Sequence, residues 1–564
     1  MLRINQVKLS TEHTGEQLHK KIASILRVPP KDILEVNIIR QSIDARKKPE
    51  IFYSYVVDVK VKGEEKLLKS ISRNKALASQ IGKSDSVVYK FPKSGAREMK
   101  HPVVIVGMGP AGLFCGYFLA LHGYRPILLE RGKDVDARQQ DVERFWQGGR
   151  LLTNSNVQFG EGGAGTFSDG KLNTLVKDKY GRNRAVLETF VKYGAKESIL
   201  YEAKPHIGTD VLSCIVKEMR QEIIRMGGQV RFESQLTDIL VEQDAVKGVV
   251  VNNQEEIPCE QLVLAIGHSA RDTFEMLYHK ALPMEQKAFA VGFRVEHSQK
   301  YMNQKLYGME ETGSLGAAPY KVTAKTSSGR GVYSFCMCPG GYVVNASSEE
   351  GRLAVNGMSY SGRNGENANS AIIVAVTPED FGSEHPLAGV AFQRTLEEKA
   401  FQLADGKIPV QRYGEFREVV LPQKTQESHG TENGKGEAIQ AVPAEENHSQ
   451  HELIQPQNKG LYEWTNLTGI LPWECNEAFV EGMECFCRQI QVFDSPNAIL
   501  SGVESRTSSP VRISRDDNSL QSTIRGIYPC GEGAGYAGGI TSAAMDGLRV
   551  AEVICKDYAP FSLS

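Results

Sequence analysis

Apolar and polar positions follow different periods in different parts of the chain. Over residues 1–100, runs rich in β-branched and aromatic residues flank a helical pattern at residues 15–26, which predicts a small α+β module. From residue 101 on, strand and helix patterns alternate, with an amphipathic helix over residues 209–226 and a strand meander over residues 229–267. This order is typical of an α/β fold, so we expect a Rossmann-like domain with a parallel sheet and an antiparallel side meander.

The alternation stops near residue 284. Residues 284–494 mix the two patterns, which indicates a second, substrate-facing α+β domain. We therefore expect an N-terminal module at 1–100 and a nucleotide-binding domain at 101–283 whose C-terminal part returns at 495–564. Residues 423–458 are polar and show no period, so we interpret them as a mobile insertion in the mixed domain.

A strand-turn-helix-strand unit at the start of the α/β part carries the spacing Gly107-x-Gly109-x-x-Gly112. In such a unit the first glycine permits the turn, the second lets a pyrophosphate approach the backbone and the third lets helix and strand pack closely. Glu130 ends the next strand, 18 residues after Gly112, where an acid accepts hydrogen bonds from an adenosine ribose. The residues expected to hold the dinucleotide here are Gly107, Gly109, Pro110, Ala111, Gly112, Glu130 and Arg131.

A second glycine cluster lies four hundred residues later, in YPCGEGAGYAGGIT. FAD is longer than NAD and requires a second surface of close backbone approach, so this cluster favours FAD as the cofactor. We expect the Glu532 carboxylate to bind a ribityl hydroxyl and the following helix to direct its N-terminus at the flavin. The residues assigned to this half of the site are Gly531, Glu532, Gly539, Ile540 and Thr541.

Two further stretches are expected to approach the cofactor. The loop FGEGGAGTFSDGKL lacks a preceding buried strand, so its Gly163, Gly165 and Thr166 are assigned to the flavin ring and not to a second nucleotide fingerprint. Ala265 and Gly267 close the strand LVLAIG and have the composition of a crossover back to the first domain.

Together these motifs resemble a known family, the uncharacterised bacterial FAD-dependent dehydrogenases of the NAD(P)/FAD-dependent oxidoreductases, which have a glutathione-reductase-type flavoprotein fold. The resemblance implies FAD binding and an oxidoreductase role, without a settled substrate. Glu532 stands where many flavoproteins have Asp, which keeps the carboxylate. The stretches that carry the resemblance are SIDARKK, GMGPAG, FGEGGAGTFSDGKLNT, FCMCPGG, GVESRTSSPVRI and YPCGEGAGYAGGI.

Candidates for the reacting groups are fewer. Asp169 and Lys171 follow the flavin loop and are proton-transfer candidates. Cys336 and Cys338 are either a redox pair or buried packing thiols, and the strained ring that such close cysteines form favours packing.

Four basic residues are candidates for holding a carboxylate or phosphate of the substrate, or else form structural ion pairs. They are Arg294, His297, Arg506 and Arg512.

Composition limits the partners and the location that we expect for the protein. The net charge is −2, but residues 1–100 carry 21 Lys+Arg against 11 Asp+Glu. We interpret this excess as a solvated lysine-rich face rather than a surface for nucleic acid or an acidic partner, because the basic residues are not interleaved with aromatics. Ten scattered cysteines without zinc spacing indicate reduced thiols in a cytoplasm and no metal site, and no segment is long and apolar enough to cross a membrane.

Three function classes remain. The leading class is an FAD-dependent oxidoreductase that acts on a small molecule by hydride transfer at flavin N5. No strand-glycine-helix fingerprint follows Gly112, so NAD(P)H is expected only as a transient electron donor. The alternatives are a flavin-dependent modifier of RNA or another macromolecule, delivered by the basic module, and a non-catalytic FAD-binding sensor. The sequence does not indicate an oligomeric state.

Overall fold

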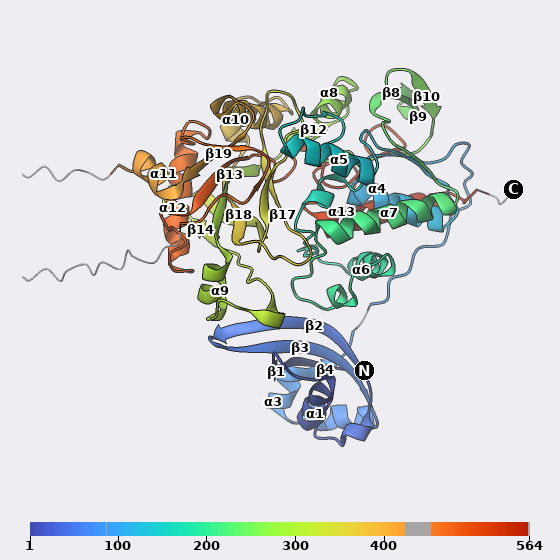
Figure 1. Ribbon diagram of the computed structural model, residues 1–564. Coiled ribbons are helices and arrows are strands. Elements are labelled where there is room, and N and C mark those ends of the chain that lie inside the picture. Colours follow the sequence, from blue (N-terminus) through green and yellow to red (C-terminus); the bar gives the residue numbers. More distant parts are fainter. Residues whose placement is uncertain (86, 423–452, 562–564) are drawn as a thin grey trace, which may run out of the picture.

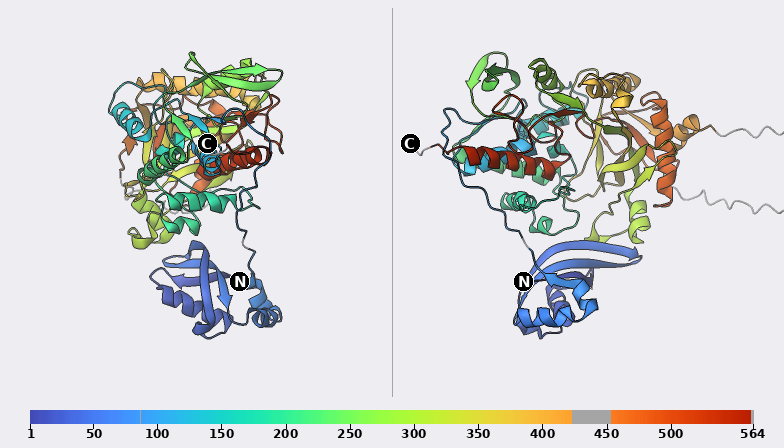
Figure 2. Two further views of the ribbon diagram at one scale, coloured as in Figure 1. Left: turned by 90° about the vertical axis from the view of Figure 1, so that its right-hand side faces the viewer. Right: turned by 180° about the vertical axis from the view of Figure 1, so that it is seen from behind.

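The computed structural model describes residues 1–85, 87–422 and 453–561. Figure 1 shows a small N-terminal module that lies beside a larger body, and the two views in Figure 2 show the same separation. The body contains a parallel sheet at one end and a large mixed sheet at the other. This α/β architecture, with a side meander and a second mixed domain, confirms the predicted fold class.

The N-terminal module is a four-stranded antiparallel sheet with the strand order β2-β3-β1-β4. Its strands are β1 (Leu2–Ser10), β2 (Ile33–Lys47), β3 (Glu50–Val61) and β4 (Ile81–Lys83), and its helices are α1 (Gly15–Leu26), α2 (Glu64–Ser72) and α3 (Lys75–Gln80). Helix α1 begins at a capping box in which Thr14 and Gln17 satisfy each other's backbone amides. The β2–β3 hairpin contacts the body, where Gln41 exchanges backbone hydrogen bonds with Tyr201 and Ala203.

The parallel sheet of the body has the strand order β24-β11-β5-β6-β7. Its strands are β5 (Val104–Val106), β6 (Ile127–Leu129), β7 (Gln229–Arg231), β11 (Leu262–Leu264) and β24 (Ile527–Pro529). Numbered along the chain, this order is 3-2-1-4-5, the order of a Rossmann sheet, whose ligands bind outside the carboxyl ends of the strands. Strand β24 pairs with β11 and so brings the second glycine cluster to the same edge as the first.

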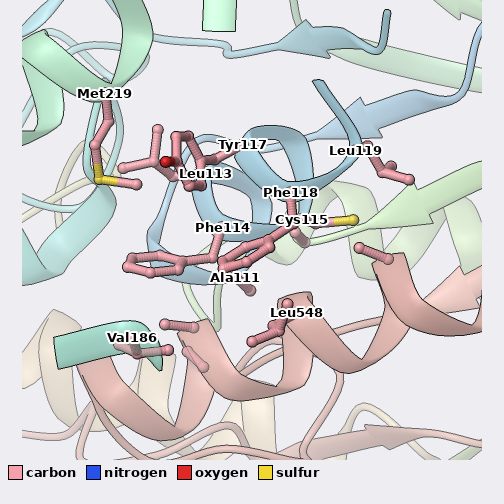
Figure 3. Close-up of a cluster of buried hydrophobic side chains, with 14 of the residues drawn as sticks. Ala111, Leu113, Phe114, Cys115, Tyr117, Phe118, Leu119, Val186, Met219 and Leu548 are labelled. Atoms are coloured by element: carbon pink, nitrogen blue, oxygen red, sulfur yellow. The ribbon is translucent and has the colours of Figure 1, made fainter. Parts of the chain in front are cut away.

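Helices cover the parallel sheet and supply its core. Helix α4 (Pro110–Leu121) is apolar on all sides and packs between α13 (Ile540–Asp557), α6 (Arg182–Lys192) and α7 (Thr209–Arg225). Figure 3 shows Phe114 and Leu113 of α4 among Met219, Val186 and Leu548 from these three helices. The side meander consists of β8 (Leu236–Glu242), β9 (Ala245–Val251) and β10 (Glu255–Pro258).

The contact between α4 and α13 is made backbone to backbone. A Cβ at Gly547 of α13 would lie 2.0 Å from the carbonyl oxygen of Ala111 in α4, and a Cβ at Gly531 would lie 2.6 Å from the Ala111 Cβ. Glycine is therefore required at both positions for the two helices to approach this closely. The N-termini of both helices consequently end at the same edge of the sheet.

The second domain is built on a seven-stranded sheet with the order β14-β15-β18-β13-β22-β19-β21. The predicted boundary at residue 495 precedes β22, which nevertheless pairs with β13 and β19 in this sheet. The chain returns to the first domain through a ribbon of β12 and β23. The strands are β12 (Met284–Gln286), β13 (Phe289–Ser298), β14 (Thr323–Lys325), β15 (Gly331–Cys338), β18 (Asn367–Val376), β19 (Ile408–Arg412), β21 (Tyr462–Trp464), β22 (Ile499–Glu504) and β23 (Val511–Ile513).

The remaining elements flank these sheets. A three-stranded sheet joins β16 (Tyr342–Asn345), β17 (Val355–Met358) and β20 (Asn458–Lys459), and the other α-helices are α5 (Val135–Trp146), α8 (Arg271–His279), α9 (Gln299–Tyr307), α10 (Ala388–Ala404), α11 (Tyr413–Val420) and α12 (Trp473–Cys487). Residues 423–452 of the predicted mobile insertion lie outside the described residues. Gln457, in the described remainder, donates a backbone hydrogen bond to Glu296.

The described part of the chain was searched for membrane-spanning helices and for metal-binding groups of side chains. None of its helices is long and apolar enough to cross a membrane. The same ranges contain no group of three or more His, Cys, Asp or Glu side chains that could hold a metal ion.

Gly547→Ala tests the helix contact. Helix propensity alone would stabilise the protein by about 1 kcal/mol, but the added methyl group would meet the Ala111 carbonyl. We expect a net loss of about 1–3 kcal/mol in the free energy of unfolding, as is typical of overpacking. Urea unfolding followed by circular dichroism measures the change.

Gly15→Ala is the control, because a Cβ in the first turn of α1 would meet no described atom within 4 Å. This variant should be neutral or slightly more stable. A Gly547→Ala protein as stable as the wild type would contradict the close contact.

Candidate functional site

A cavity of about 330 Å³ lies where the parallel sheet meets the second domain. Its walls come from the carboxyl ends of β5, β6 and β11, from the N-terminal ends of α4 and α13, and from β15 and β22. Ligand sites of α/β proteins occur at this place relative to the sheet. The predicted cofactor residues that line it are Gly107, Gly109, Pro110, Ala111, Glu130, Arg131, Gly163, Gly165, Ala265, Gly267, Glu532, Gly539 and Ile540.

In the first glycine turn, Gly107 has a backbone conformation that requires glycine, and Gly109 borders empty space. Gly107 has φ +95° and a Cβ there would lie 2.3 Å from the Ala265 carbonyl, so only glycine fits. At Gly109, by contrast, the first described atom that a Cβ would meet is 3.9 Å away. Gly109 is the N-cap of α4 and Pro110 its first residue, so the free amides of the first turn and the helix dipole face the cavity.

Glu130 is held rigidly at the end of β6. Its carboxylate is buried and accepts backbone hydrogen bonds from Met108 at 2.9 Å, Gly132 at 2.9 Å and Gly160 at 3.0 Å. The neighbouring Arg131 forms an ion pair with Asp272 and lies over the ring of Phe159, with its guanidinium carbon 4.4 Å from the ring centroid. Both side chains reach the cavity at the edge where a ribose is expected.

The second glycine turn faces the same cavity. At Gly538 and Gly539 a Cβ would meet no described atom within 4 Å, and the extended backbone of Gly539 suits any residue. Protein contacts therefore do not require glycine at either position. The loop of Gly163 and Gly165 closes the gap between the turns: a Cβ would lie 2.9 Å from the Gly109 Cα at Gly163 and 3.2 Å from Ile540 at Gly165.

Four predicted cofactor residues do not line the cavity, and each has another role. Gly112 makes room for the carbonyl oxygen of Gly107, as its predicted packing role required. Gly531 makes room for Ala111, so it serves the helix contact. Thr166 is buried with its hydroxyl donating to the Glu161 carbonyl at 3.3 Å, and Thr541 donates to the Leu172 carbonyl at 2.9 Å.

The second domain contributes charged and sulfur-bearing groups to the cavity. Lys171 and Cys336 line it, together with Phe335, Asn356 and Glu504. Asp169 lies behind this wall, fully buried, with the Lys171 ammonium 2.9 Å away and the Arg363 guanidinium paired to the same carboxylate. Cys338 is also buried behind the wall.

The four basic substrate candidates are engaged elsewhere. Arg294 is buried in an ion pair with Glu504 at 2.7 Å, and Arg506 lines the cavity but pairs with Glu397 at 2.7 Å. His297 is buried with Nε2 2.7 Å from the Phe493 carbonyl oxygen. Arg512 is half-exposed on β23, near Glu285. The expectation that they bind substrate is not supported, because structural partners satisfy them or they lie away from the cavity.

The sequence gave no indication that His268 belongs to the candidate site. This residue follows Gly267 in the cavity wall, and its Nε2 lies 3.9 Å from a carboxylate oxygen of Glu532. Burial, with help from Arg506 and Arg271, lowers the pKa of His268 to about 3, so the ring is neutral. Burial raises the pKa of Glu532 to about 7, against the opposing effect of Lys287. A carboxyl that gains or loses a proton near neutral pH therefore faces the cavity.

Comparison with known proteins found a relative along nearly the whole chain and a family model that matches the second domain. An uncharacterised protein of Clostridium beijerinckii is 46% identical over 561 residues, which cover 99% of each chain. The model of the family described as FAD-dependent protein, C-terminal domain-like, matches residues 288–435 and 423–507. The chain belongs to this family of FAD-dependent proteins. A domain of unknown function, DUF8436, matches residues 1–60 of the N-terminal module.

Solved structures with partial similarity include two further proteins. Glycine oxidase from Bacillus cereus is 12% identical with a TM-score of 0.28, covering 81% of this chain and 95% of its own. The glycerol-3-phosphate dehydrogenase from Bacillus halodurans, complexed with FAD, is 11% identical with a TM-score of 0.26, covering 49% of this chain and 48% of its own. Similarity at this level assigns neither a substrate nor a reaction.

FAD, the cofactor of this family of FAD-dependent proteins, fits the residues present. A Cβ at Gly109, Gly538 or Gly539 would approach no described atom closer than 3.9 Å. The space beside these glycines is therefore available to a ligand. The two helix N-termini offer unpaired amides for its phosphates and ring carbonyls, and Glu130 and Glu532 offer carboxylates for its hydroxyl groups. These amides and carboxylates thus provide hydrogen-bond partners along an extended dinucleotide.

Gly539→Val tests this fit. Because the extended backbone accepts valine and no described atom obstructs it, the stability of the FAD-free protein should not fall. FAD affinity should drop by at least about tenfold, or 1.4 kcal/mol, because the side chain occupies ligand space. Titration of FAD-free protein followed by flavin fluorescence measures the affinity.

Gly469→Val is the matched control, since a Cβ at this exposed glycine also meets no described atom within 4 Å. Its FAD affinity should equal that of the wild type. If Gly539→Val binds FAD as tightly as Gly469→Val, the second turn does not contact the cofactor.

Glu532→Gln tests the shifted carboxyl. The pKa of Glu532 is higher in the folded protein than in the unfolded chain, so the folded state binds the extra proton and loses stability as the pH rises from about 4.5 to about 7. The full loss is up to about 3 kcal/mol. Relative to the wild type, the FAD-free variant should therefore gain about 1–3 kcal/mol in unfolding free energy between about pH 5 and about pH 8.

Urea unfolding at the two pH values measures this difference. Glu418→Gln, on the exposed face of α11, controls for the loss of one carboxylate. An effect of Glu532→Gln that is the same at both pH values would contradict the upward shift.

Proposed function

We propose that the chain is an FAD-dependent oxidoreductase that acts on a small molecule in the half of the cavity formed by the second domain. One observation supports this most directly: a single cavity joins the amide-rich ends of α4 and α13 to a wall with a titratable carboxyl, an ammonium group and a thiol. A protein that only stores FAD has no need of such a wall. Perturbed titratable groups in a cavity are typical of reaction sites.

FAD, when bound, supplies hydride exchange at flavin N5, and the protein supplies position and electrostatics. The backbone N–H groups of Gly109, of Ala111 and of the first turn of α13 orient the cofactor, and the neutral ring of His268 adds a polar contact without a charge. Phe335 and Ile540 contribute apolar side chains to the cavity wall.

Glu532 is the group that holds or releases a proton. Its pKa of about 7 places it near the optimum for a general acid or base at neutral pH. About 26% of its side chain is exposed, so protons can exchange with solvent. Lys171 is fixed by Asp169 and keeps its charge, because the attraction of Asp169 and the two cysteines outweighs burial and raises its pKa. We assign Lys171 to binding and not to proton transfer.

The number of dinucleotide sites in the fold limits the choice of electron donor. The parallel sheet with its glycine turn accounts for one dinucleotide site in the described chain. NAD(P)H would therefore bind transiently at the open side of the cavity, or the substrate itself would be the donor. We place the reaction among those of small molecules, because the substrate would share this cavity with FAD.

Anaerobic reduction of the FAD-loaded protein tests the proposal. NADH, NADPH and a panel of small alcohols, amines and hydroxy acids are added, and flavin absorbance is followed. At least one compound should bleach the flavin with saturable kinetics. Glu532→Gln should slow that reaction by about 10²–10⁴-fold, the usual contribution of a general acid or base.

Dithionite controls for flavin access and should reduce the wild type and the variant equally. A flavin that dithionite reduces, but that stays oxidised with every donor and is reoxidised no faster by any quinone, would show a binding protein instead of an enzyme.

A further inference from the structure

The strand that carries Cys336 and Cys338 is interrupted at these residues. In the pairing of β15 with β18, Phe335 lies opposite Ala371 and Cys338 opposite Asn369, so two residues of β15 face one residue of β18. This is a β-bulge, and Cys336 has φ +44°, which is rare for a residue with a side chain. Bulges are common next to reaction sites because they redirect side chains.

Hydrogen bonds hold the bulge in place. The carbonyl oxygen of Cys336 accepts from Arg294 at 2.9 Å and from the Cys338 thiol at 3.1 Å. Arg294 also contacts the sulfur of Cys338 at 3.9 Å. Cys336 lines the cavity while Cys338 stays buried behind it, so the two thiols have different surroundings.

The ion pairs around the bulge contain more cations than carboxylates. Three cations, Lys171, Arg363 and Arg294, share two carboxylates: Asp169 pairs with Lys171 and Arg363, and Glu504 pairs with Arg294. One positive charge remains, and burying it unpaired would be costly.

Four other titratable groups act near these ion pairs. Burial raises the pKa of Glu296 to about 7, against the opposing effect of Arg294, and burial with Arg363 and Lys171 lowers the pKa of Lys204.

His206 is kept neutral by burial and by Arg363, which lower its pKa to about 4. Glu532, in the turn after β24, is influenced by Lys287 and by Cys336, and burial raises its pKa to about 7.

We propose that Cys336 is a nucleophilic thiolate built into the cavity wall, with Lys171 as its counter-ion and Cys338 retaining the proton. The thiolate supplies the third negative charge of the cluster. The Cys338 thiol, Lys171 and Arg294 lower the pKa of Cys336 well below its ordinary value, whereas burial and the neighbouring Cys336 raise that of Cys338. The ligands of such a site are small molecules with an electrophilic carbon. The proposal concerns the thiol alone and does not depend on redox turnover.

Alkylation of the full-length FAD-loaded protein with iodoacetamide tests the nucleophile. The Cys336 sulfur attacks the reagent carbon, an S–C bond forms, the C–I bond breaks and iodide leaves. Mass spectrometry of the peptides compares Cys336 with Cys214, which is exposed on α7. At about pH 6 Cys336 should react at least about tenfold faster, since its larger thiolate fraction outweighs its lower intrinsic nucleophilicity.

Lys171→Met and Lys133→Met form a matched pair of variants. Lys133 is 33% exposed and pairs with the buried Asp141 at 2.9 Å, as Lys171, 32% exposed, pairs with Asp169 at 2.9 Å. Loss of Lys171 should shift the pH midpoint of Cys336 alkylation upward and slow the reaction at about pH 6 by about tenfold, the effect of one pKa unit. Loss of Lys133 should leave both unchanged. A midpoint that stays fixed in Lys171→Met would overturn the role of Lys171.

A second measurement does not require reagent access. The ultraviolet absorbance of a thiolate should be present near neutral pH in the wild type and missing from Cys336→Ser with equal FAD content. Alkylation of Cys336 no faster than that of Cys214 would overturn its role as a nucleophile. Equal absorbance of the two proteins would overturn the thiolate itself.

Discussion

The backbone contact between α4 and α13 is the constraint on which the site depends. Two helices from distant parts of the chain direct their first turns at one cavity, and where Gly547 meets Ala111 no side chain separates their backbones. Gly547 and Gly531 provide that approach by leaving Ala111 free to touch the second helix. Strand β24 fixes the register, because it pairs with β11 beside the strand that starts the first turn. The glycines of the second cluster thus divide into those that allow helix packing and those that leave space for FAD.

The cavity has two chemically different sides. One side is made of backbone amides and glycine, which suits a cofactor that carries phosphates and needs close approach. The other side, from the second domain, carries buried ion pairs and thiols. The first side accounts for the family's cofactor, and the second side carries the titratable groups to which we assign the proposed reaction. The N-terminal module packs its hairpin on the body through backbone hydrogen bonds of Gln41.

Local patterns predicted the first half of the site well. The roles of Gly107 and Gly112 follow from the turn and the helix packing alone, and both are observed. Gly531 was assigned to the cofactor, because sequence spacing cannot distinguish a glycine that faces a ligand from one that faces a helix. For Arg294 and Arg506 the sequence left substrate binding and structural ion pairs open, because their carboxylate partners, Glu504 and Glu397, belong to other elements. The boundary near residue 495 depends on β22, whose pairing partners lie far away in the sequence.

The features that sequence reasoning missed are those created by distant segments. His268 is a single histidine after a strand, and only the fold brings it within 3.9 Å of the Glu532 carboxylate. Cys336 owes its environment to a bulge and to Lys171, which precedes it by 165 residues. Neither a bulge nor a charge imbalance leaves a periodic signal in the chain.

Hydrogen exchange on adding FAD measures the central claim most directly, because it reports on both turns in one experiment. The account predicts that backbone amides near residues 107–114 and 538–545 are protected together, with a stoichiometry of one FAD per chain, while the sheet of the N-terminal module is unchanged. Protection of one turn without the other would contradict a single cofactor held between two helix ends.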